Sequence, residues 1–179
     1  MLADAAGIAE VQVASWQAAY RGQIPDAYLD ALDVHQRTAA WRQILGSSEW
    51  PQRGALVLER GHLERDHLER ADPEPDRALI GFVHVGPGRG EDLSPATGEV
   101  TALYLRQEHW RRGGGRRLMA AATDALRRGG FSEAVLWVLA TNERGRAFYE
   151  AEEWSPDGAQ RQEDRGGVVL DEIRLRRRL

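Results

Sequence analysis

The chain has 179 residues, a length typical of one domain whose core is large enough to fold without cross-links. It contains no cysteine, which excludes disulfides, thiolate nucleophiles and thiolate metal sites. Hydrophobic residues make up 42% of the chain and charged residues 29%, and no apolar run approaches the ~20 residues of a membrane span. Residues 1–4 lack the cationic and apolar parts of a signal peptide. We therefore expect one soluble, cytoplasmic domain over residues 1–179, without a membrane partner.

Charge is distributed unevenly along the chain. The formal net charge is −4, but residues 106–128 hold seven arginines against two acids, so the rest of the chain sums to −9. A short cationic segment favours a small polyanionic ligand, because nucleic acid normally needs a broad basic face. We therefore do not expect a nucleic-acid partner. The terminal RLRRRL is interpreted as a frayed strand end, with nucleic-acid contact as the alternative.

The first third of the chain has helical periodicity. Apolar side chains at helical spacing predict a helix over residues 7–20, and a short helix is predicted over 26–32. Asp33 is placed to cap a third helix over 34–45. The side chains that this third helix is expected to bury are Ala40, Trp41, Ile44 and Leu45.

Strand periodicity begins after this helical region. The apolar runs 55–59 and 78–85 predict two buried, neighbouring strands joined as a hairpin. The connection, residues 60–76, repeats the tetrapeptide HLER. It could supply a metal site, but a solvated, charged connection is the preferred interpretation, so we expect no metal. The candidate ligands in it are His62, Asp66 and His67.

The second half alternates strands with helices. Strands are predicted over 99–105, 134–139 and 168–175, and helices over 115–128 and 142–152. The helix after the Gly-rich turn has a stripe expected to be buried, made of Leu118, Met119, Ala122 and Leu126. This order of elements indicates a mixed α/β sheet with at least one parallel crossover, and no internal domain boundary is found.

The sequence WRRGGGRR at 110–117 lies between a predicted strand and a predicted helix. Consecutive glycines allow a tight turn with several N–H groups in one concavity, and a helix N-terminus adds positive charge. Arginines around the turn strengthen the prediction of phosphate binding, whose alternative is a plain turn. A P-loop is excluded because the chain has no lysine, and neither G-x-G-x-x-G nor G-x-S-x-G is present.

A second motif follows about 30 residues later. The sequence NERGRAFYEAEEW has Asn142, Phe148, Tyr149 and Trp154 at the places of N-x-x-A-x-x-F-Y-x-x-x-G-F, with Glu153 where glycine is common. With the Gly-rich loop before it, residues 99–154 resemble the core of the GCN5-related N-acetyltransferase (GNAT) superfamily. The front of the chain, SWQAAYRG followed by IPDAYLDAL, also resembles one branch of this superfamily.

The resemblance implies an α/β (α+β) fold. Its central sheet would be mixed and mostly antiparallel, with a splayed parallel strand pair and helices on both faces. Acetyl-CoA, a co-substrate, would lie in the V-shaped gap that a bulge opens between strands 101–105 and 134–139. The implied cofactor-binding residues are Leu103, Tyr104, Leu105, Arg111, Arg112, Gly113, Gly114, Gly115, Arg116, Asn142 and Tyr149.

The resemblance also implies catalytic roles. Tyr149 would be the general acid that protonates the departing thiolate, and the N–H of Leu105 would polarise the thioester carbonyl. Glu99 is our candidate for the base that deprotonates the amine through water. Other candidates for this base are Asp171, Glu172, His84 and His109. On the acceptor side, the tentative substrate-binding residues are Trp16, Tyr20 and Tyr28.

The implied function is transfer of an acetyl group from acetyl-CoA to a primary amine of a small molecule or peptide. Because the chain has no cysteine, we expect direct attack without an acyl-enzyme. An inactive acyl-CoA-binding sensor is the alternative, and an amine attached to nucleic acid is a third reading that the acidic balance disfavours. Relatives often dimerise, so a homodimer is allowed. Relatives also usually begin with a strand before the first helix, so this chain lacks that edge strand or starts late.

Overall fold

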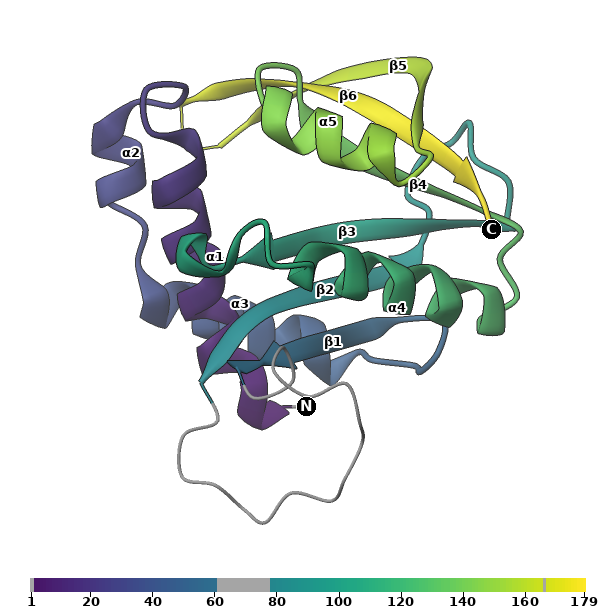
Figure 1. Ribbon diagram of the computed structural model, residues 1–179, viewed down its shortest axis with the longest axis horizontal. Coiled ribbons are helices and arrows are strands. Elements are labelled where there is room, and N and C mark those ends of the chain that lie inside the picture. The colour runs from purple at the N-terminus through teal and green to yellow at the C-terminus, as the bar shows by residue number, and fades with distance from the viewer. Residues whose placement is uncertain (1, 61–77, 166) are drawn as a thin grey trace.

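The computed structural model describes residues 2–60, 78–165 and 167–179. The helices are α1 (Ala5–Tyr20), α2 (Asp26–Asp30), α3 (Val34–Gly46), α4 (Gly114–Arg128) and α5 (Glu143–Ala151), with short turns η1 (Leu2–Asp4) and η3 (Gln107–His109). The strands are β1 (Gly54–Glu59), β2 (Leu79–Pro87), β3 (Thr97–Leu105), β4 (Glu133–Leu139), β5 (Ser155–Asp164) and β6 (Val169–Arg178). Figure 1 shows their arrangement around one sheet.

The six strands form a single sheet in the order β1-β2-β3-β4-β6-β5. Every neighbouring pair is antiparallel except β3 and β4, which are parallel and are connected through α4. The predicted mixed, mostly antiparallel fold is therefore confirmed, as is the pairing of the strands predicted at 55–59 and 78–85. No strand precedes α1 among the described residues, so β1 forms this edge of the sheet.

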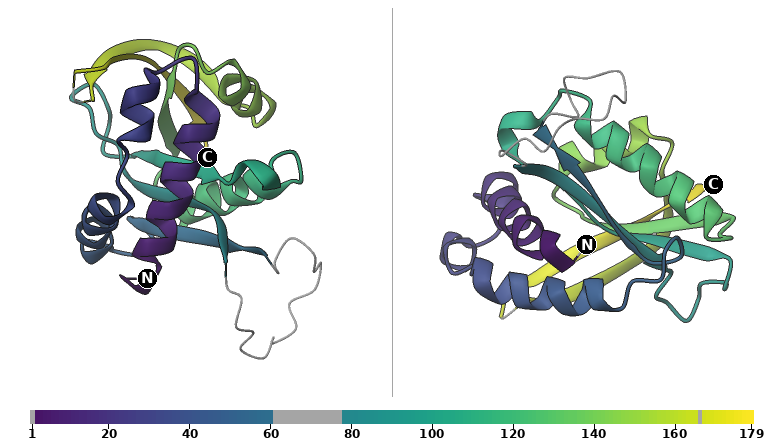
Figure 2. Two further views of the ribbon diagram at one scale, coloured as in Figure 1. Left: turned by 90° about the vertical axis from the view of Figure 1, so that its left-hand side faces the viewer. Right: turned by 90° about the horizontal axis from the view of Figure 1, so that it is seen from below.

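Helices cover both faces of the sheet. Helices α1 and α3 lie on one face of β1 to β3, and α4 lies on the other, beside α5 (Figures 1 and 2). The predicted stripe of α4 is buried at 0–3% exposure and joins the main core: Leu118, Met119, Ala122 and Leu126. The sheet is thus held between two helical layers, which fixes the positions of the strand ends.

Helix α3 confirms the predicted cap but not the whole predicted stripe. Asp33 accepts a hydrogen bond from the N–H of Gln36 at 2.7 Å. The buried residues are Thr38, Trp41 and Leu45, whereas Ala40 and Ile44 are exposed. The prediction for Ala40 and Ile44 was wrong, because they lie on the neighbouring stripe of the helix, about 100° away from the one that packs on α1 and β2.

The end of the chain differs most from the prediction. The expected frayed tail is part of β6, which pairs with β4 up to Arg178 and lies between two other strands. Its other neighbour, β5, was not predicted. Arg174 and Arg176 both donate to the carboxylate of Asp157 on β5, at 2.7 and 3.1 Å. Ion pairs within the sheet therefore hold a segment whose sequence alone indicated only a basic end.

Two expectations concern features that are absent from the described segments. Within residues 2–60, 78–165 and 167–179, no helix is long and apolar enough to cross a membrane. In the same segments no group of three or more His, Asp or Glu side chains could hold a metal ion. The HLER repeat, with His62, Asp66 and His67, lies outside the described residues.

Candidate active site

The site begins where β3 and β4 separate. The two strands pair only from Thr97 to Glu99, and the rest of β3 has no partner on that side. On the β2 side, His84 pairs with Ala102 and Val85 with Val100, which leaves Thr101 as an extra residue in β3. Such a bulge bends a strand locally. The predicted bulge and splayed pair are therefore confirmed.

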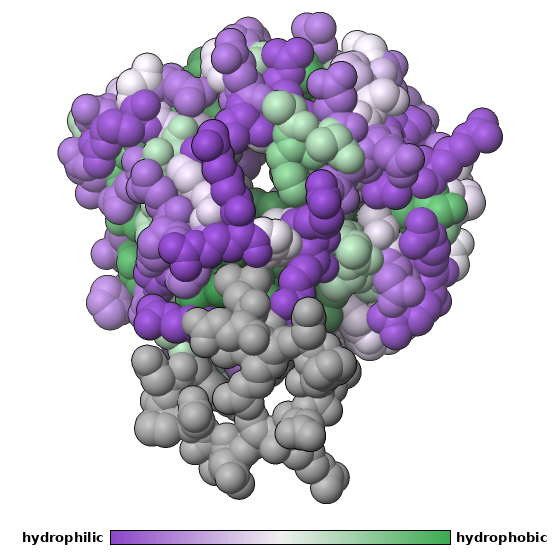
Figure 3. Space-filling view, in the orientation of Figure 1, coloured by the Kyte–Doolittle hydropathy of each residue, from purple (hydrophilic) through white to green (hydrophobic). Residues whose placement is uncertain are grey.

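A cavity of about 910 Å³ occupies the opening between the two strands. Its walls come from α1, β3, the start of α4, β4, α5 and the last two strands. In Figure 3 the face shown in Figure 1 is hollowed near its centre, with hydrophilic residues around much of the opening. A volume of this size is within the range of small-molecule and cofactor sites.

The last residues of β3 present backbone groups to the cavity. Arg106 donates its N–H to the carbonyl of Ile80 on β2 at 2.8 Å. Because successive residues of a strand alternate, the backbone N–H and C=O groups of Leu103 and Leu105 face away from β2. No β4 residue pairs with them, so they form an open strand edge that can bind an extended ligand.

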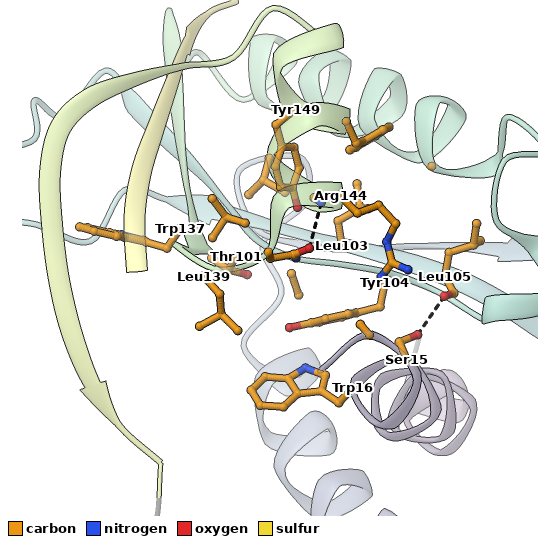
Figure 4. Close-up of a pocket in the computed structure, with 18 of the residues that line it drawn as sticks. Ser15, Trp16, Thr101, Leu103, Tyr104, Leu105, Trp137, Leu139, Arg144 and Tyr149 are labelled. Atoms are coloured by element: carbon orange, nitrogen blue, oxygen red, sulfur yellow. Dashed lines mark hydrogen bonds between the residues drawn. The ribbon is translucent and has the colours of Figure 1, made fainter. Parts of the chain in front are cut away.

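Two side chains fix the end of this edge. The carbonyl of Leu105 accepts a hydrogen bond from Ser15 Oγ at 3.0 Å (Figure 4). It also accepts one from Trp110 Nε1 at 2.7 Å. The guanidinium of Arg144 lies 3.6 Å from the centroid of the Trp110 ring, a cation–π contact between α5 and the loop. Sequence reasoning gave Ser15 and Arg144 no role, since both contacts join segments that are distant in the chain.

The Gly-rich loop leaves free N–H groups at the start of α4. Arg111 and Gly113 have φ angles of 59° and 82°, which turn the chain into the helix. The first backbone hydrogen bond of α4 runs from Arg117 N–H to the carbonyl of Gly113 at 3.1 Å. The N–H groups before Arg117 therefore have no acceptor within the helix, and with the helix dipole they favour an anion. They belong to Gly114, Gly115 and Arg116.

Not every predicted loop residue reaches the cavity. Four of them line it: Arg111, Gly113, Gly115 and Arg116. Gly114 is buried behind the loop, where an added Cβ would lie 3.1 Å from a methyl group of Leu58. Arg112 is exposed and is not part of the cavity wall. The roles of all six toward a cofactor stay predictions.

Tyr149 projects from α5 into the cavity, opposite Tyr104 of β3 (Figure 4). Burial, and then the nearby phenol of Tyr104, raise the pKa of Tyr149 above its usual range. Its hydroxyl therefore stays protonated at neutral pH and acts as a hydrogen-bond donor. The predicted role as an acid requires this protonation state.

Asn142 has a structural role beside its predicted one. It is the N-cap of α5, and its Oδ1 accepts a hydrogen bond from Gly145 N–H at 2.9 Å. A Cβ at position 145 would lie 2.5 Å from Asn142 Nδ2, so only glycine fits there without a shift. The side chain of Asn142 is thus fixed at the cavity wall, where it also forms a hydrogen bond with the side chain of Tyr20.

Glu99 lies in the wall of the cavity, beside the bulge, as half of an ion pair. It is only 2% exposed and accepts hydrogen bonds from the backbone N–H, Nε and Nη2 of Arg89 at 3.1, 3.2 and 2.9 Å. Both residues line the cavity. The structure thus brings Glu99 to the expected place beside the bulge, already bonded to a cation that the sequence did not indicate.

The other candidates for the base are distributed differently. Glu172 lines the cavity and accepts a hydrogen bond from Arg161 Nε at 2.7 Å. His84 lines a smaller, second cavity, with its Nδ1 2.6 Å from Thr101 Oγ1. Asp171 and His109 line neither cavity. Among the four, only Glu172 shares the main cavity with Glu99.

Two of the three predicted acceptor-side aromatics reach the cavity. Trp16 and Tyr20 line it, and their rings meet edge to face with centroids 5.2 Å apart. Tyr28 is not in the cavity wall, and instead packs against Trp16 with ring centroids 6.4 Å apart. Burial raises the pKa of Tyr20 above its usual range, so this phenol also stays protonated.

The far wall is charged and was missed because β5 was not predicted. Arg161 and Glu163 of β5 and Arg165, just after it, line the cavity. Arg161 lies over the ring of Trp137 at 4.3 Å, and Arg165 pairs with Glu163 at 2.8 Å. Residues 155–164, SPDGAQRQED, gave no strand signal, because the segment is polar at almost every position and has no apolar face.

Comparison of this chain with known proteins finds acetyltransferases, both among family models and among individual relatives. The model of the acetyltransferase (GNAT) family matches residues 24–152. YuaI of Bacillus subtilis (strain 168), an uncharacterized N-acetyltransferase, is 30% identical over 175 residues, which cover 97% of this chain and 87% of that protein. Mycothiol acetyltransferase of Kocuria rhizophila is 40% identical over 142 residues, 70% of this chain and 46% of that protein.

Solved structures share the fold at lower identity. The PaiA N-acetyltransferase from Thermoplasma acidophilum, in complex with coenzyme A, aligns with a TM-score of 0.62 at 19% identity. The alignment covers 96% of this chain and 92% of that one. The yncA structure from Salmonella typhimurium, with its cofactor acetyl-CoA, has a TM-score of 0.65 at 22% identity and covers 99% and 90% of the two chains.

Proposed function

Because the chain belongs to the acetyltransferase (GNAT) family, we propose that it transfers the acetyl group of acetyl-CoA to a primary amine of a small molecule or peptide. One observation carries this proposal. A single cavity joins the free N–H groups at the start of α4, the open edge of β3 and the hydroxyl of Tyr149. These are an anion site, a peptide-like docking edge and a proton donor, in the order that a thioester of coenzyme A requires.

The proposed donor lies along the cavity. Its diphosphate is placed at the start of α4, where backbone N–H groups and arginines attract negative charge. Its amide-containing arm then follows the edge of β3 and exchanges hydrogen bonds with Leu103 as an added strand does. Leu105 offers only its N–H, because its C=O already accepts from Trp110 and Ser15. The coenzyme A and acetyl-CoA complexes of the two similar structures support this placement.

The reaction is a direct transfer. The lone pair of the amine attacks the thioester carbonyl carbon, whose oxygen accepts a hydrogen bond from Leu105 N–H. A new C–N bond forms as the C–S bond breaks, and the thiolate of coenzyme A takes a proton from the hydroxyl of Tyr149. The chain has no cysteine, so no thiolate of the protein can carry the acetyl group.

The amine must also lose a proton, because an ammonium nitrogen has no lone pair. Glu99 is the proposed acceptor of this proton, through a water molecule. Its ion pair with Arg89 holds the carboxylate in the wall of the cavity, beside the bulge. Glu172, bonded to Arg161, is the second candidate for this role.

The function can be tested by following thiol release from acetyl-CoA with a panel of amines. We expect turnover with wild-type protein, and Tyr149→Phe should lower kcat by roughly 100-fold or more, the usual contribution of a positioned acid. The affinity of Tyr149→Phe for acetyl-CoA, measured by calorimetry, should not change.

The outcomes separate the proposal from its alternative. Affinity for acetyl-CoA without turnover on any amine would favour the acyl-CoA sensor, and no affinity for coenzyme A would remove the donor altogether. Unchanged turnover in Tyr149→Phe would exclude this residue as the acid. A homodimer and a cytoplasmic location stay predictions.

A further inference from the structure

A second cavity, of about 410 Å³, lies on the face of the sheet that α3 covers. The charged side chains in its wall are all cationic: no Asp or Glu is among the described residues that line it. Its four arginines come from four separate segments, namely α3, the turn before β1, the loop after β2 and the turn after β5. They are Arg37, Arg53, Arg89 and Arg165.

The positive charge in this wall is only partly compensated. Arg89 pairs with Glu99 at 2.9 Å, and Arg165 pairs with Glu163 at 2.8 Å. Among the described residues, no ion pair is found for Arg37 or Arg53. Two guanidinium groups are therefore available, and each can bind an oxyanion with paired N–H donors.

The neighbouring histidine responds to this charge. His84 lines the same cavity, and its pKa is lowered to about 4 by burial first and then by Arg89 and Arg53. The imidazole is therefore neutral at pH 7, and the charge of the wall comes from the arginines. The cavity thus combines aromatic and apolar surface from α3, including Trp41, with an excess of positive charge.

The second cavity adjoins the first. Six residues line both: Trp16, Arg89, Thr101, Ala102, Tyr104 and Arg165. Thr101 is the bulge residue at which β3 leaves β4. The start of α4, where the diphosphate is placed, lies on the opposite face of the sheet (Figure 2). An anion in the second cavity is therefore not the diphosphate of the donor.

We propose that the second cavity binds the anionic group of the acceptor, held by Arg37 and Arg53, so that the acceptor is a small amine that also carries a carboxylate, phosphonate or phosphate. This assignment rests on the proposed function. The anion anchors one end of the molecule on the α3 face, and the amine reaches past Thr101 toward the thioester. Paired charges of this kind fix orientation as well as affinity.

The test uses matched acceptors with and without the anion. The pairs are an amino acid and its amide, and an aminoalkylphosphonate and the corresponding amino alcohol. Thiol release from acetyl-CoA is measured for wild type, for the double variant Arg37→Gln/Arg53→Gln, and for the control Arg42→Gln. Arg42 lies on the same helix but is exposed and lines neither cavity.

We expect wild type to prefer the anionic member of at least one pair, and the pair that it prefers identifies the anion as a carboxylate or a phosphonate. In the double variant, KM for that acceptor should rise roughly tenfold or more, as expected for lost charged hydrogen bonds. KM for acetyl-CoA, KM for the neutral member, and all constants of Arg42→Gln should stay within twofold. An unchanged KM for the anionic acceptor in the double variant would overturn the assignment, as would acetylation of neutral amines only.

A second measurement does not depend on turnover. Inorganic phosphate is titrated into protein saturated with coenzyme A, and the imidazole resonances of His84 are followed by NMR, identified by their loss in His84→Gln. We expect a saturable shift in wild type that is lost in the double variant. No shift in wild type would overturn the anion site. If the protein neither binds coenzyme A nor acetylates any amine, the proposed function fails, and with it the acceptor assignment, while the phosphate titration of free protein still decides whether the cavity binds anions.

Discussion

Glu153 is the residue at which the chain departs from the glycine common in the second motif. Its φ angle is 64°, in the left-handed region that costs residues with a side chain roughly 1 kcal/mol. Its carboxylate pairs with Arg177 at 2.9 Å, but the side chain is 80% exposed, so this pair contributes little. We expect Glu153→Gly to increase the free energy of unfolding by about 1 kcal/mol, measured by urea denaturation.

The matched control is Glu153→Ala. Alanine removes the ion pair with Arg177 and keeps the backbone strain, so its stability should equal that of wild type or fall slightly below it. If the glycine and alanine variants have the same stability, the positive φ angle at this position carries no measurable cost.

His84 makes stability depend on pH. In the unfolded chain its pKa is near 6.5, and in the fold burial lowers it to about 4. Between these values the unfolded state binds a proton that the folded state does not, so stability falls as the pH falls from about 6.5 to about 4. The full contribution, roughly 3 kcal/mol, is present above pH 6.5 and lost below pH 4.

The measurement compares wild type with His84→Gln by denaturant unfolding at several pH values. Glutamine does not titrate, so the variant should lose less stability than wild type between pH 6.5 and 4, while both lose the part due to carboxylates. Parallel pH profiles for the two proteins would show that His84 is not held neutral in the fold.

At the scale of the elements, the loop before α4 requires a positive φ angle at Gly113. Gly113 has a φ angle of 82° and no neighbour within 4 Å of an added Cβ, so Gly113→Ala introduces strain without a clash. We expect the strain to move the N–H groups of α4 and weaken coenzyme A binding by roughly tenfold, measured by calorimetry.

Gly130, at the other end of α4, is the control. Its φ angle of 90° is also positive and its surroundings are also open, so Gly130→Ala should lower stability to a similar extent. It lies outside the cavity, and its affinity for coenzyme A should stay at the wild-type value. Equal losses of affinity in both variants would mean that strain acts through overall stability and not through the loop.

The helices and strands that could be predicted have their sequence signals within or next to their own residues. The helix at 114–128 has a buried stripe and a glycine at each end, and α3 has its cap in Asp33, so period and capping were sufficient. Strand β5 has no such signal, because it is an edge strand stabilised by pairing with β6 and by the ion pairs of Asp157. Partners distant in sequence decide that element, and a local pattern does not contain them.

At the scale of the whole molecule, the two proposed halves of the site also differ in how far their residues are separated in the sequence. The proposed donor half comes from residues 99–154, which are nearly continuous, so a motif could locate it. The proposed acceptor half is assembled from α1, α3, the β2–β3 loop and the turn after β5, and its arginines have no common spacing. The net charge of −4 gave no indication of this group of arginines, because net charge does not show which charged side chains lie together in the fold.

The sheet itself leads to a final prediction. Strands β3 and β4 join its two halves through only three paired positions, Thr97 to Glu99, and the cavity separates them beyond that point. A donor bound along β3 and below α5 bridges the halves and binds only the folded state, so it must stabilise the protein. At 100 times its dissociation constant, coenzyme A should add about 2.7 kcal/mol, which for a chain of this size raises Tm by roughly 5–10 °C.

Differential scanning calorimetry with increasing coenzyme A measures this shift, and pantetheine, which lacks the diphosphate, is the comparison ligand. Hydrogen exchange locates the effect, since the amides of Leu103 and Leu105 should gain protection only when the arm pairs with β3. A rise in Tm with no protection at these two amides would place the ligand elsewhere. The diphosphate would then bind to α4 without its arm entering the split sheet, and the order of groups on which the chemistry depends would be lost.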